Sequence, residues 1–316
     1  MRRPTGVLLM TFGSAQNVEE VPTYLRSVRG GDPDPAVVAE FQRRYEIIGW
    51  SPLVRITREQ GDALQRLLDA QGTGRYVVAV GMLHSEPRID EAVTALAERG
   101  VHGVIGIVLS PQHSPIIMGR YDRALADACS RHLPGVALRV AGPWHTVPSF
   151  VDELAGRVTE ALARFPDPSQ VPLIFTAHSL PRAVVDRDPA YIDQLMETID
   201  RVAEGAGLPP ERWQFAYQSA GHTAEEWLKP DLKDLLPGLR DTGYDDVLVV
   251  PVQFLADHLE ILHDIDVAAR QEAEEAGLRL HRIDLPNVSP VFIRALAEVV
   301  QREEHGIALP SSRNAY

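Results

Sequence analysis

The chain has 316 residues, of which 45% are hydrophobic and 24% are charged. These proportions are typical of a globular protein and exclude a disordered or membrane-spanning chain, and the length suits two lobes better than one core. The formal net charge of -13 argues against nucleic acid or an anionic membrane surface as the main partner. The overall charge of the protein would repel an anionic ligand, so such a ligand must be bound by arginines close to its site.

The only cysteine, Cys129, lies in an expected helix from Tyr121 to His132. One thiol cannot form an internal disulfide or by itself hold zinc or an iron–sulfur cluster, so we expect it to be buried and inert. The N-terminal run MRRPTGVLLMTF has two arginines and an apolar stretch. That stretch is too short for a signal peptide and lacks a small-residue cleavage site after it. We therefore expect a first strand there, a cytoplasmic location and no integral membrane segment.

The first half of the chain alternates short apolar runs with longer amphipathic segments, a pattern that predicts a parallel α/β sheet. The expected strands are Gly6–Phe12, Tyr76–Leu83, Val104–Leu109 and Ala137–Val140. The expected helices lie near Val18–Val28, Pro35–Ile48, Ile56–Ala70 and Glu91–Glu98. Before the first of these, Asn17 and Glu20 have the spacing of a helix cap.

The second half repeats this pattern. Its expected strands are Leu173–Ala177, Gln214–Tyr217, Val247–Val250 and Leu278–Ile283. Its expected helices lie near Phe150–Phe165, Pro189–Ala203, Asp257–Ala276 and Val291–Arg302. We predict two similar Rossmann-like lobes, residues 1–145 and 146–316, each with a four-stranded parallel sheet flanked by helices. The lobes would join near GPWHTVP, with an active-site cleft between them, because ligands bind beyond the carboxyl ends of parallel strands.

Polar and aromatic residues gather where the expected strands end. They are Phe12, Ser14, His84, Gln112, His113, Ser114, His178, Ser179, Gln218, Ser219 and the segment Gln253–Glu260. The sequence has no GxGxxG, GxxxxGKS/T or GxSxG motif, so a nucleotide cradle or a nucleophile elbow has no support. The strand ends are where we expect the functional site.

Two segments, TAHSLP and FLADHLEILHDID, favour metal and proton chemistry. In an α-helix at 100° per residue, Asp257, Glu260 and Asp264 fall within an arc of about 60°. An imidazole at a strand end, His178, facing this carboxylate ladder could handle both a metal ion and protons. The same spacing fits a structural alternative, with Asp257 as an N-cap and Glu260 closing a capping box. His178 alone could equally be a hydrogen-bonded core histidine, so spacing leaves both interpretations open.

Arginines are frequent in the segments SVRGGDPDP and RRYEIIGWSPL. Arg29, Arg43 and Arg44 lie there with Tyr45 and Ser51. Arginines on amphipathic helices usually face solvent. Near a cleft in an acidic protein they would instead anchor carboxylate groups through bidentate hydrogen bonds.

These motifs together resemble those of the ferrochelatases, which insert ferrous iron into a porphyrin in haem biosynthesis. The resemblance covers nearly the whole chain, through GVLLMTFGSAQ, YLRSVRGG, RRYEIIGWSPL, GMLHSEPRIDEAV, TAHSLP and PVQFLADHLEILHDID. GMLHSEP and YQSAGHTAEEWLKPD are more similar to the soluble, monomeric coproporphyrin ferrochelatases than to the protoporphyrin enzymes. The resemblance thus implies a lyase that converts coproporphyrin III to coprohaem.

The resemblance also implies roles for individual residues. His178 would handle metal and protons, Glu260 would be its partner carboxylate, and Asp264 would be the next acid of the ladder. His178 and Glu260 would be the metal ligands. Positions implied to contact the porphyrin or its propionates are Phe12, Arg29, Arg44, Tyr45, Ser51 and Tyr121. With its ordinary pKa of about 6.5, His178 would accept a pyrrole proton near neutral pH.

Two positions depart from the family pattern. Phe12 stands where the coproporphyrin subtype often has a tyrosine that ligates the product iron, and a phenyl ring cannot ligate. Ala268 stands where the ladder would have its third acid. An outer metal site described for the family is therefore in doubt.

The implied substrates are a porphyrin and ferrous iron, with no permanently bound cofactor and no iron–sulfur cluster. Transient contact with neighbouring enzymes of the haem pathway is a further expectation. Three alternatives stay open: a protoporphyrin IX ferrochelatase, a cobalt or nickel chelatase of a related tetrapyrrole, and a non-catalytic haem or porphyrin carrier. A carrier would need a strong axial ligand, which Phe12 does not supply.

Overall fold

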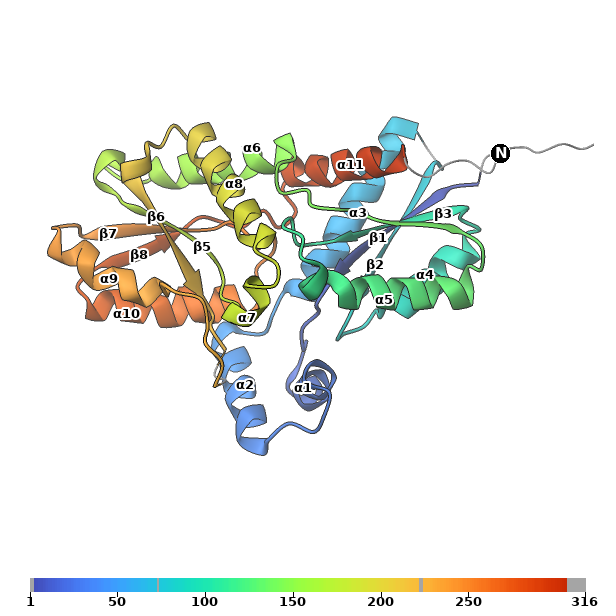
Figure 1. The fold of residues 1–316 in the computed structure, drawn as a ribbon, viewed down its shortest axis with the longest axis horizontal. Coiled ribbons are helices and arrows are strands. Elements are labelled where there is room, and N and C mark those ends of the chain that lie inside the picture. Colours follow the sequence, from blue (N-terminus) through green and yellow to red (C-terminus); the bar gives the residue numbers. More distant parts are fainter. Residues whose placement is uncertain (1–2, 73, 222–223, 306–316) are drawn as a thin grey trace, which may run out of the picture.

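The computed structural model describes residues 3–72, 74–221 and 224–305, and Figure 1 shows them as two α/β lobes side by side. The sheet of the first lobe has the order β2-β1-β3-β4, and that of the second has the order β6-β5-β7-β8. Every neighbouring pair of these strands is parallel. The prediction of two similar lobes, each with a four-stranded parallel sheet flanked by helices, is confirmed.

The strands follow the apolar runs of the sequence. The first sheet consists of β1 Thr5–Thr11, β2 Tyr76–Met82, β3 Gly103–Val108 and β4 Ala137–Val140. The second consists of β5 Leu173–His178, β6 Trp213–Gln218, β7 Asp246–Pro251 and β8 Arg279–Arg282. The inner strands β1, β3, β5 and β7 are almost entirely buried. Helices cover both faces of a parallel sheet, which is why such strands are continuous apolar runs that the sequence predicts well.

Helices follow most of the strands. The first half has α1 Val21–Arg29, α2 Pro35–Ile48, α3 Leu53–Gly72, α4 Ile89–Glu98 and α5 Pro115–His132. The second half has α6 Pro148–Leu162, α7 Arg182–Val185, α8 Ala190–Gly205, α9 Leu232–Asp241, the π-helix η4 Glu260–Ala269, α10 Arg270–Glu275 and α11 Pro290–Glu304. Short 3-10 helices span Val18–Glu20, Pro168–Gln170 and Pro210–Arg212. The predicted cap before the first of them is confirmed, because the Asn17 side chain accepts the Glu20 N–H at 3.0 Å.

Some helices differ from the prediction. α5 begins at Pro115 rather than Tyr121, because proline is favoured in the first turn of a helix. α9 was not expected, since Pro237 inside it is a breaker signal in a sequence. The helix expected from Asp257 onward begins only at Glu260 and is a π-helix before it continues as α10.

One hydrophobic core cluster spans both lobes. Leu9 of β1 and Phe175 of β5 both belong to it. At the join, Trp144 packs against Phe150 and Phe292, with ring centroids 5.2 Å and 6.4 Å away. The two sheets therefore share this cluster of buried apolar side chains, and each lobe also has a core cluster of its own.

The last described helix, α11, returns from the second half of the chain to the first lobe. There it contacts α3 and β3, as well as α6, and Figure 1 shows it beside α3. The first sheet is thus covered in part by a helix from the second half of the sequence. The boundary between residues 145 and 146 stays a prediction, and residues 306–316 lie outside the described part of the chain.

α1 and α2 form an excursion from the first lobe that lies below both sheets in Figure 1. Val21 and Leu25 of α1, Tyr45 of α2 and Ala15 make a small apolar cluster, against which Leu259 of the second lobe packs. α2 also contacts η4. The excursion therefore links the lobes near the carboxyl ends of the strands.

Cys129 is buried in α5. Burial raises the pKa of its thiol to about 11, as expected for an inert cysteine. Within the described ranges of the chain, we find no helix with the length and apolarity needed to cross a membrane.

Candidate active site

His178 ends β5 and is held in one orientation. Its backbone N–H donates to the Oε1 of Gln253 at 2.9 Å, and its ring Nδ1 contacts the carbonyl oxygen of Ser179. A carbonyl can only accept, so Nδ1 carries the hydrogen and Nε2 is the atom available for chemistry. The side chain is 28% exposed, so His178 is not a closed core histidine.

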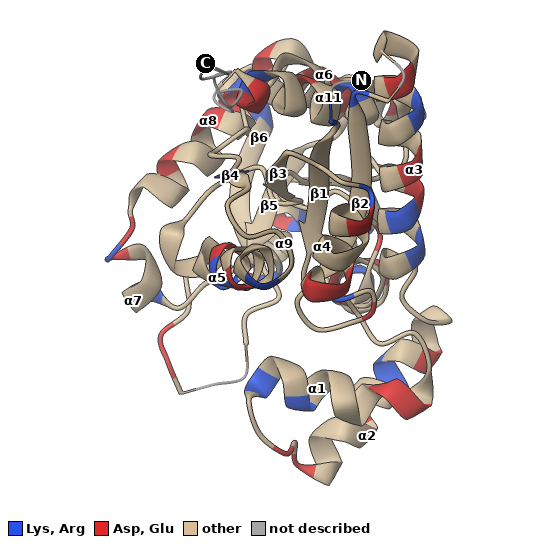
Figure 2. Cartoon of the chain, turned by 90° about the vertical axis from the view of Figure 1, so that its right-hand side faces the viewer, with Lys and Arg blue, Asp and Glu red and all other residues tan. Residues whose placement is uncertain are grey.

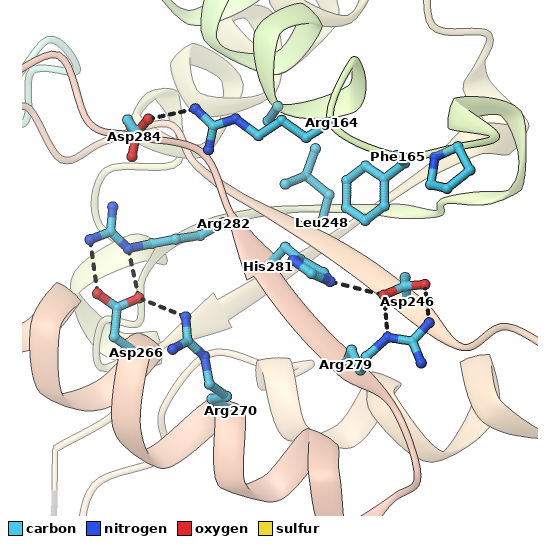
Figure 3. A pocket seen from close by; sticks show the side chains of 12 residues that line it. Arg164, Phe165, Asp246, Leu248, Asp266, Arg270, Arg279, His281, Arg282 and Asp284 are labelled. Atoms are coloured by element: carbon cyan, nitrogen blue, oxygen red, sulfur yellow. Dashed lines mark hydrogen bonds and ion pairs between the residues drawn. The ribbon is translucent and has the colours of Figure 1, made fainter.

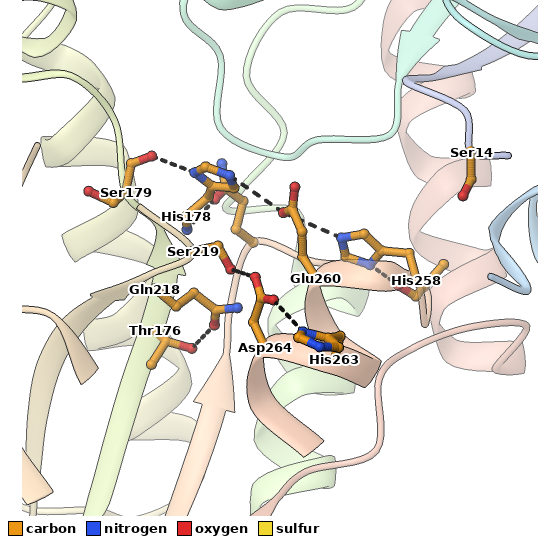
Figure 4. Close-up of polar contacts among 12 residues, drawn as sticks. Ser14, Thr176, His178, Ser179, Gln218, Ser219, His258, Glu260, His263 and Asp264 are labelled. Atoms are coloured by element: carbon orange, nitrogen blue, oxygen red, sulfur yellow. Dashed lines mark hydrogen bonds and ion pairs between the residues drawn. The ribbon is translucent and has the colours of Figure 1, made fainter. Parts of the chain in front are cut away.

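Glu260, at the start of η4, lies between two imidazoles. Figure 4 shows the Nε2 of His178 directed at the Glu260 carboxylate, 3.5 Å from its Oε2. The Nε2 of His258 lies 3.7 Å from the same oxygen, because its Nδ1 is held 2.9 Å from the carbonyl oxygen of Ala256. His258 was not among the site residues predicted from the sequence. In a regular helix a residue two positions before Glu260 would face away from it, whereas His258 precedes the helix.

The His178–Glu260 pair is charged at neutral pH. Burial by itself lowers the pKa of His178, but the Glu260 carboxylate, together with the Ser179 carbonyl and Asp264, outweighs burial and raises that pKa to about 9. Burial by itself raises the pKa of Glu260, but His178 and His258 hold it well below its usual range. The Glu260 side chain is 38% exposed, so water weakens both pKa shifts without reversing their direction. The resting pair is thus an imidazolium and a carboxylate. The pKa of His178 is higher than the ordinary value expected from the sequence.

Asp264 lies one turn further along η4. Its Oδ2 accepts a hydrogen bond from the Ser219 hydroxyl at 2.6 Å, and its Oδ1 is 3.1 Å from the Nδ1 of His263. Ser219 follows β6 with a φ of 58°, a left-handed conformation that is uncommon outside glycine. Asp264 also helps to raise the pKa of His178. It therefore belongs to the same charged group, and Ala268 adds no further acid to it.

Asp257 does not belong to this group. Its carboxylate accepts from Arg282 at 3.0 Å and from the side-chain amide of Asn287 at 2.8 Å. Arg282, only 13% exposed, also donates to both oxygens of Asp266 on η4, each at 2.8 Å. The predicted face of three acids and the alternative capping box are both wrong, because η4 begins after Asp257, with Leu259 at its N-cap and no side-chain cap. Arg282 instead links the segment before η4 to η4 by donating hydrogen bonds to both Asp257 and Asp266.

Tyrosines of the first lobe approach the charged group from the opposite side. The hydroxyl of Tyr45 is 2.9 Å from the Oγ of Ser14, and that of Tyr24 donates to the carbonyl of Gly13 at 3.3 Å. Burial raises the pKa of both phenols, and the nearby Glu260 carboxylate adds to the rise. Both phenols are therefore neutral, and Leu259, the neighbour of Glu260 in the second lobe, packs against the apolar cluster that contains Tyr45.

Phe12 and Tyr121 also belong to this side of the molecule. Phe12 follows β1 with 38% of its surface exposed, and its ring lies 4.4 Å from that of His84, centroid to centroid. Tyr121, on α5, is 7% exposed, and burial raises the pKa of its phenol.

The remaining predicted substrate contacts lie on or beside the excursion. Arg29 is exposed in the last turn of α1, a helix with arginines and no acid (Figure 2), and it forms no ion pair with any described residue. Arg44 is partly buried on α2, where its Nε donates to Glu40 at 2.8 Å. Ser51 is 8% exposed after α2. The structure thus groups His178, Glu260 and Asp264, whereas no contact joins Arg29, Arg44 or Ser51 to them.

A cavity of about 510 Å³ lies elsewhere, behind η4 at the β8 edge of the second sheet. Figure 3 shows its charged lining already paired, Arg279 with Asp246 and Arg164 with Asp284. Arg282 also contributes to this wall. None of the predicted site residues lines it, so this cavity is separate from the candidate site.

Among the residues that the structure describes, no group of three or more His, Cys, Asp or Glu side chains could hold a metal ion. His178 and Glu260 can offer one imidazole nitrogen and carboxylate oxygens. This borderline donor set suits first-row metals such as iron. Any further ligands would have to come from water or from a second substrate.

Comparison with known sequences gives a consistent family. The sequence model named Ferrochelatase matches residues 4–304. A ferrochelatase of Herpetosiphon aurantiacus is 39% identical over 304 residues, which cover 95% of this chain and 99% of the relative. A ferrochelatase of Deinococcus radiodurans is 37% identical and covers 97% of this chain and 98% of the relative. A coproporphyrin III ferrochelatase of Geobacillus sp. (strain WCH70) is 36% identical, with 95% and 97% covered.

Solved structures share the two-lobed architecture. The sirohydrochlorin chelatase SirB from Bacillus subtilis subspecies spizizenii, in complex with cobalt, has a TM-score of 0.56 at 12% identity and covers 96% of this chain and 97% of its own. CbiX, described as the terminal enzyme for biosynthesis of siroheme in denitrifying bacteria, has a TM-score of 0.53 at 16% identity, with 94% and 98% covered. At these identities the likeness shows the fold alone.

Proposed function

The chain belongs to the ferrochelatase family of metal-chelating lyases, and from this premise we propose that it inserts ferrous iron into coproporphyrin III to give coprohaem. The observation that carries the proposal is the Oε2 of Glu260, which lies 3.5 Å from the Nε2 of His178 and 3.7 Å from that of His258. The carboxylate and the His178 imidazole can hold a metal briefly, and the imidazoles within reach of the carboxylate can take up protons. Relatives named coproporphyrin III ferrochelatase support the choice of porphyrin.

Insertion exchanges the pyrrole protons of the ring for ferrous iron, so a base must be available when the metal arrives. His178 begins protonated, because its pKa is about 9. Ferrous iron bound at Glu260 would neutralise the carboxylate that stabilises the His178 imidazolium. Burial would then favour the neutral imidazole. His178 would pass its own proton toward Asp264, and its freed Nε2 would accept one of the two pyrrole protons. Glu260 would take the other as the iron leaves it for the ring. Iron binding and proton removal would in this way be coupled through Glu260.

Protons must then leave the site. Asp264 lies one turn from Glu260 and helps to raise the pKa of His178. Its carboxylate is hydrogen-bonded to Ser219 and His263. We propose that it passes protons from His178 and Glu260 toward solvent.

The porphyrin would lie between the lobes. A flat macrocycle presents its nitrogen lone pairs poorly to a metal above it, so we propose that the lobes bend the ring as they bind it. Phe12, Tyr45 and Tyr121 would contact the ring. Arg29, Arg44 and Ser51 would bind propionates. No permanently bound cofactor is expected, and contacts with neighbouring haem-pathway enzymes and the cytoplasmic location stay predictions.

Anaerobic absorbance spectroscopy tests the proposed reaction. Purified protein is mixed with coproporphyrin III or protoporphyrin IX, each with and without ferrous iron. We expect the metalloporphyrin spectrum to form fastest with coproporphyrin and iron. Faster metallation of protoporphyrin would overturn the choice of substrate, and tight porphyrin binding without metallation would favour the carrier alternative. Cobalt and nickel in place of iron test the remaining alternative, a chelatase of another metal.

A further inference from the structure

A cluster of basic residues lies beside Phe12, at the carboxyl ends of β1 and β2. The Nδ1 of His84 is 2.9 Å from the hydroxyl oxygen of Ser27 on α1. The same oxygen accepts from the Nη1 of Arg88 at 3.3 Å, and this Nη1 also donates to the carbonyl of Leu83. We call Ser27, His84, Arg88 and the neighbouring Arg120 the Arg88 cluster.

Arg88 is held on one side and free on the other. Both of its side-chain hydrogen bonds use Nη1, and its Nε and Nη2 donate to no other described residue. Glu91 accepts only the backbone N–H of Arg88, at 2.8 Å. The Nε–Nη2 edge is the one that binds a carboxylate through two parallel hydrogen bonds, and here it is pre-oriented with no acid on it.

The charge of the cluster is not neutralised. Burial, followed by the charges of Arg120 and Arg88, lowers the pKa of His84 to about 4, so His84 is neutral and both guanidinium groups are cationic. Neither Arg88 nor Arg120 forms an ion pair with a described residue, although the chain carries a net charge of -13. Unpaired arginines in an acidic protein are an electrostatic site for an anion.

The cluster adjoins the candidate active site. The ring of His84 packs against Phe12, and Arg120 affects the pKa of Tyr121 as well as that of His84. Arg88 precedes α4 of the first lobe, whereas Arg44 lies on α2, which contacts η4 of the second lobe. Figure 1 shows α2 and α4 on opposite sides of α1. Anchors at these two places would hold different edges of one bound ring.

We propose that Arg88 and Arg120 form a carboxylate subsite for a propionate that coproporphyrin carries where protoporphyrin has a vinyl group. The inference rests on the proposed function and extends it to the choice between these porphyrins. A vinyl group cannot accept hydrogen bonds, so protoporphyrin leaves the free edge of Arg88 without a partner. Sites built to hydrogen-bond a substrate group discriminate against analogues that lack it.

Porphyrin binding without metal tests the subsite. The affinities of wild-type protein, Arg88→Gln and Arg120→Gln for both porphyrins are measured by fluorescence quenching. Each substitution should weaken coproporphyrin binding by about tenfold, the value of one charge-assisted hydrogen bond, and change protoporphyrin binding less than about twofold. Arg88→Lys keeps the positive charge but cannot donate two parallel hydrogen bonds to one carboxylate. Its affinity for coproporphyrin should therefore lie between those of Arg88→Gln and the wild type.

Arg99→Gln is the matched control, since it removes an exposed, unpaired arginine from the other end of α4. It should leave both affinities unchanged. Equal losses for the two porphyrins, or no loss in either cluster variant, would overturn the subsite. Arg120 is exposed, so its variant gives a result even if Arg88→Gln fails to fold. Failure of the wild-type protein to metallate either porphyrin would overturn the proposed reaction and leave this binding result standing.

Discussion

β1 and β5 hold equivalent positions in sheets of the same strand order, yet the residues at their ends differ in kind. β1 is followed by Phe12, whose phenyl ring neither titrates nor ligates a metal. β5 ends in His178, whose pKa is raised to about 9 beside Glu260. In the first lobe, burial raises the pKa of Tyr45 and Tyr121, which keeps both phenols neutral.

The difference indicates a division of labour on a repeated scaffold. The first lobe contributes apolar and phenolic surface and arginines, which suit holding a flat anionic ligand. The second contributes an imidazolium–carboxylate pair and a further acid, which suit moving protons and a metal. Changes in the second lobe should therefore affect rate, and changes in the first should affect binding.

The largest expected effect comes from His178→Ala. Without this imidazole the rate of metallation should fall by about a hundredfold or more, because the proton acceptor is lost, whereas porphyrin affinity should change little. Single-turnover absorbance measures the rate, and fluorescence quenching measures the affinity. His281→Ala is a matched control, since it removes another imidazole paired with a carboxylate, that of Asp246, outside the site. Near-normal turnover in His178→Ala would contradict the assignment.

A smaller effect on rate and a clear effect on titration are expected from Glu260→Gln. The carboxylate is what lifts the pKa of His178 to about 9 against burial, so in the variant this pKa should fall below its ordinary value of 6.5. NMR of the imidazole protons as a function of pH measures it. In the wild type, the stability that Glu260 confers through His178 should be complete below pH 6.5 and lost as pH rises through about 9. An unchanged pKa of about 9 in the variant would show that another group charges His178.

The smallest effect is expected from Arg44→Gln in the first lobe. Arg44 is partly neutralised by Glu40, so its loss should weaken porphyrin binding by about fivefold or less and leave the metallation rate at saturation unchanged. Arg43→Gln is the control, because Arg43 also pairs with Glu40 but its side chain is 59% exposed. A loss of rate at unchanged affinity would contradict the anchor role and the division between the lobes.

Several features could be predicted from the sequence because they depend on local patterns. The strands were predicted to within a residue or two, since buried parallel strands are continuous apolar runs between turn residues. The position of His178 at the end of a strand followed from the same runs. α9 was not predicted, because Pro237 lies inside it, although Leu236 and Leu239 on either side of the proline are buried in a core cluster.

The candidate site was predicted in part. His178, Glu260 and Asp264 were correctly grouped, but Asp257 was assigned to the same face on the assumption of a regular α-helix. In the structure Asp257 binds Arg282 and Asn287 instead. His258 was missed because its relation to Glu260 depends on an irregular segment before η4.

The sequence by itself determined the class of fold, the order of the strands along the chain and the residue types available at their ends. Only the tertiary structure decided which atoms face each other: the Nε2 of His178 and of His258 on one oxygen of Glu260, and the guanidinium of Arg282 between Asp257 and Asp266. It also decided the protonation state of His178. Local patterns depend on neighbours along the chain, whereas these contacts and pKa values depend on charges that packing brings together from distant segments.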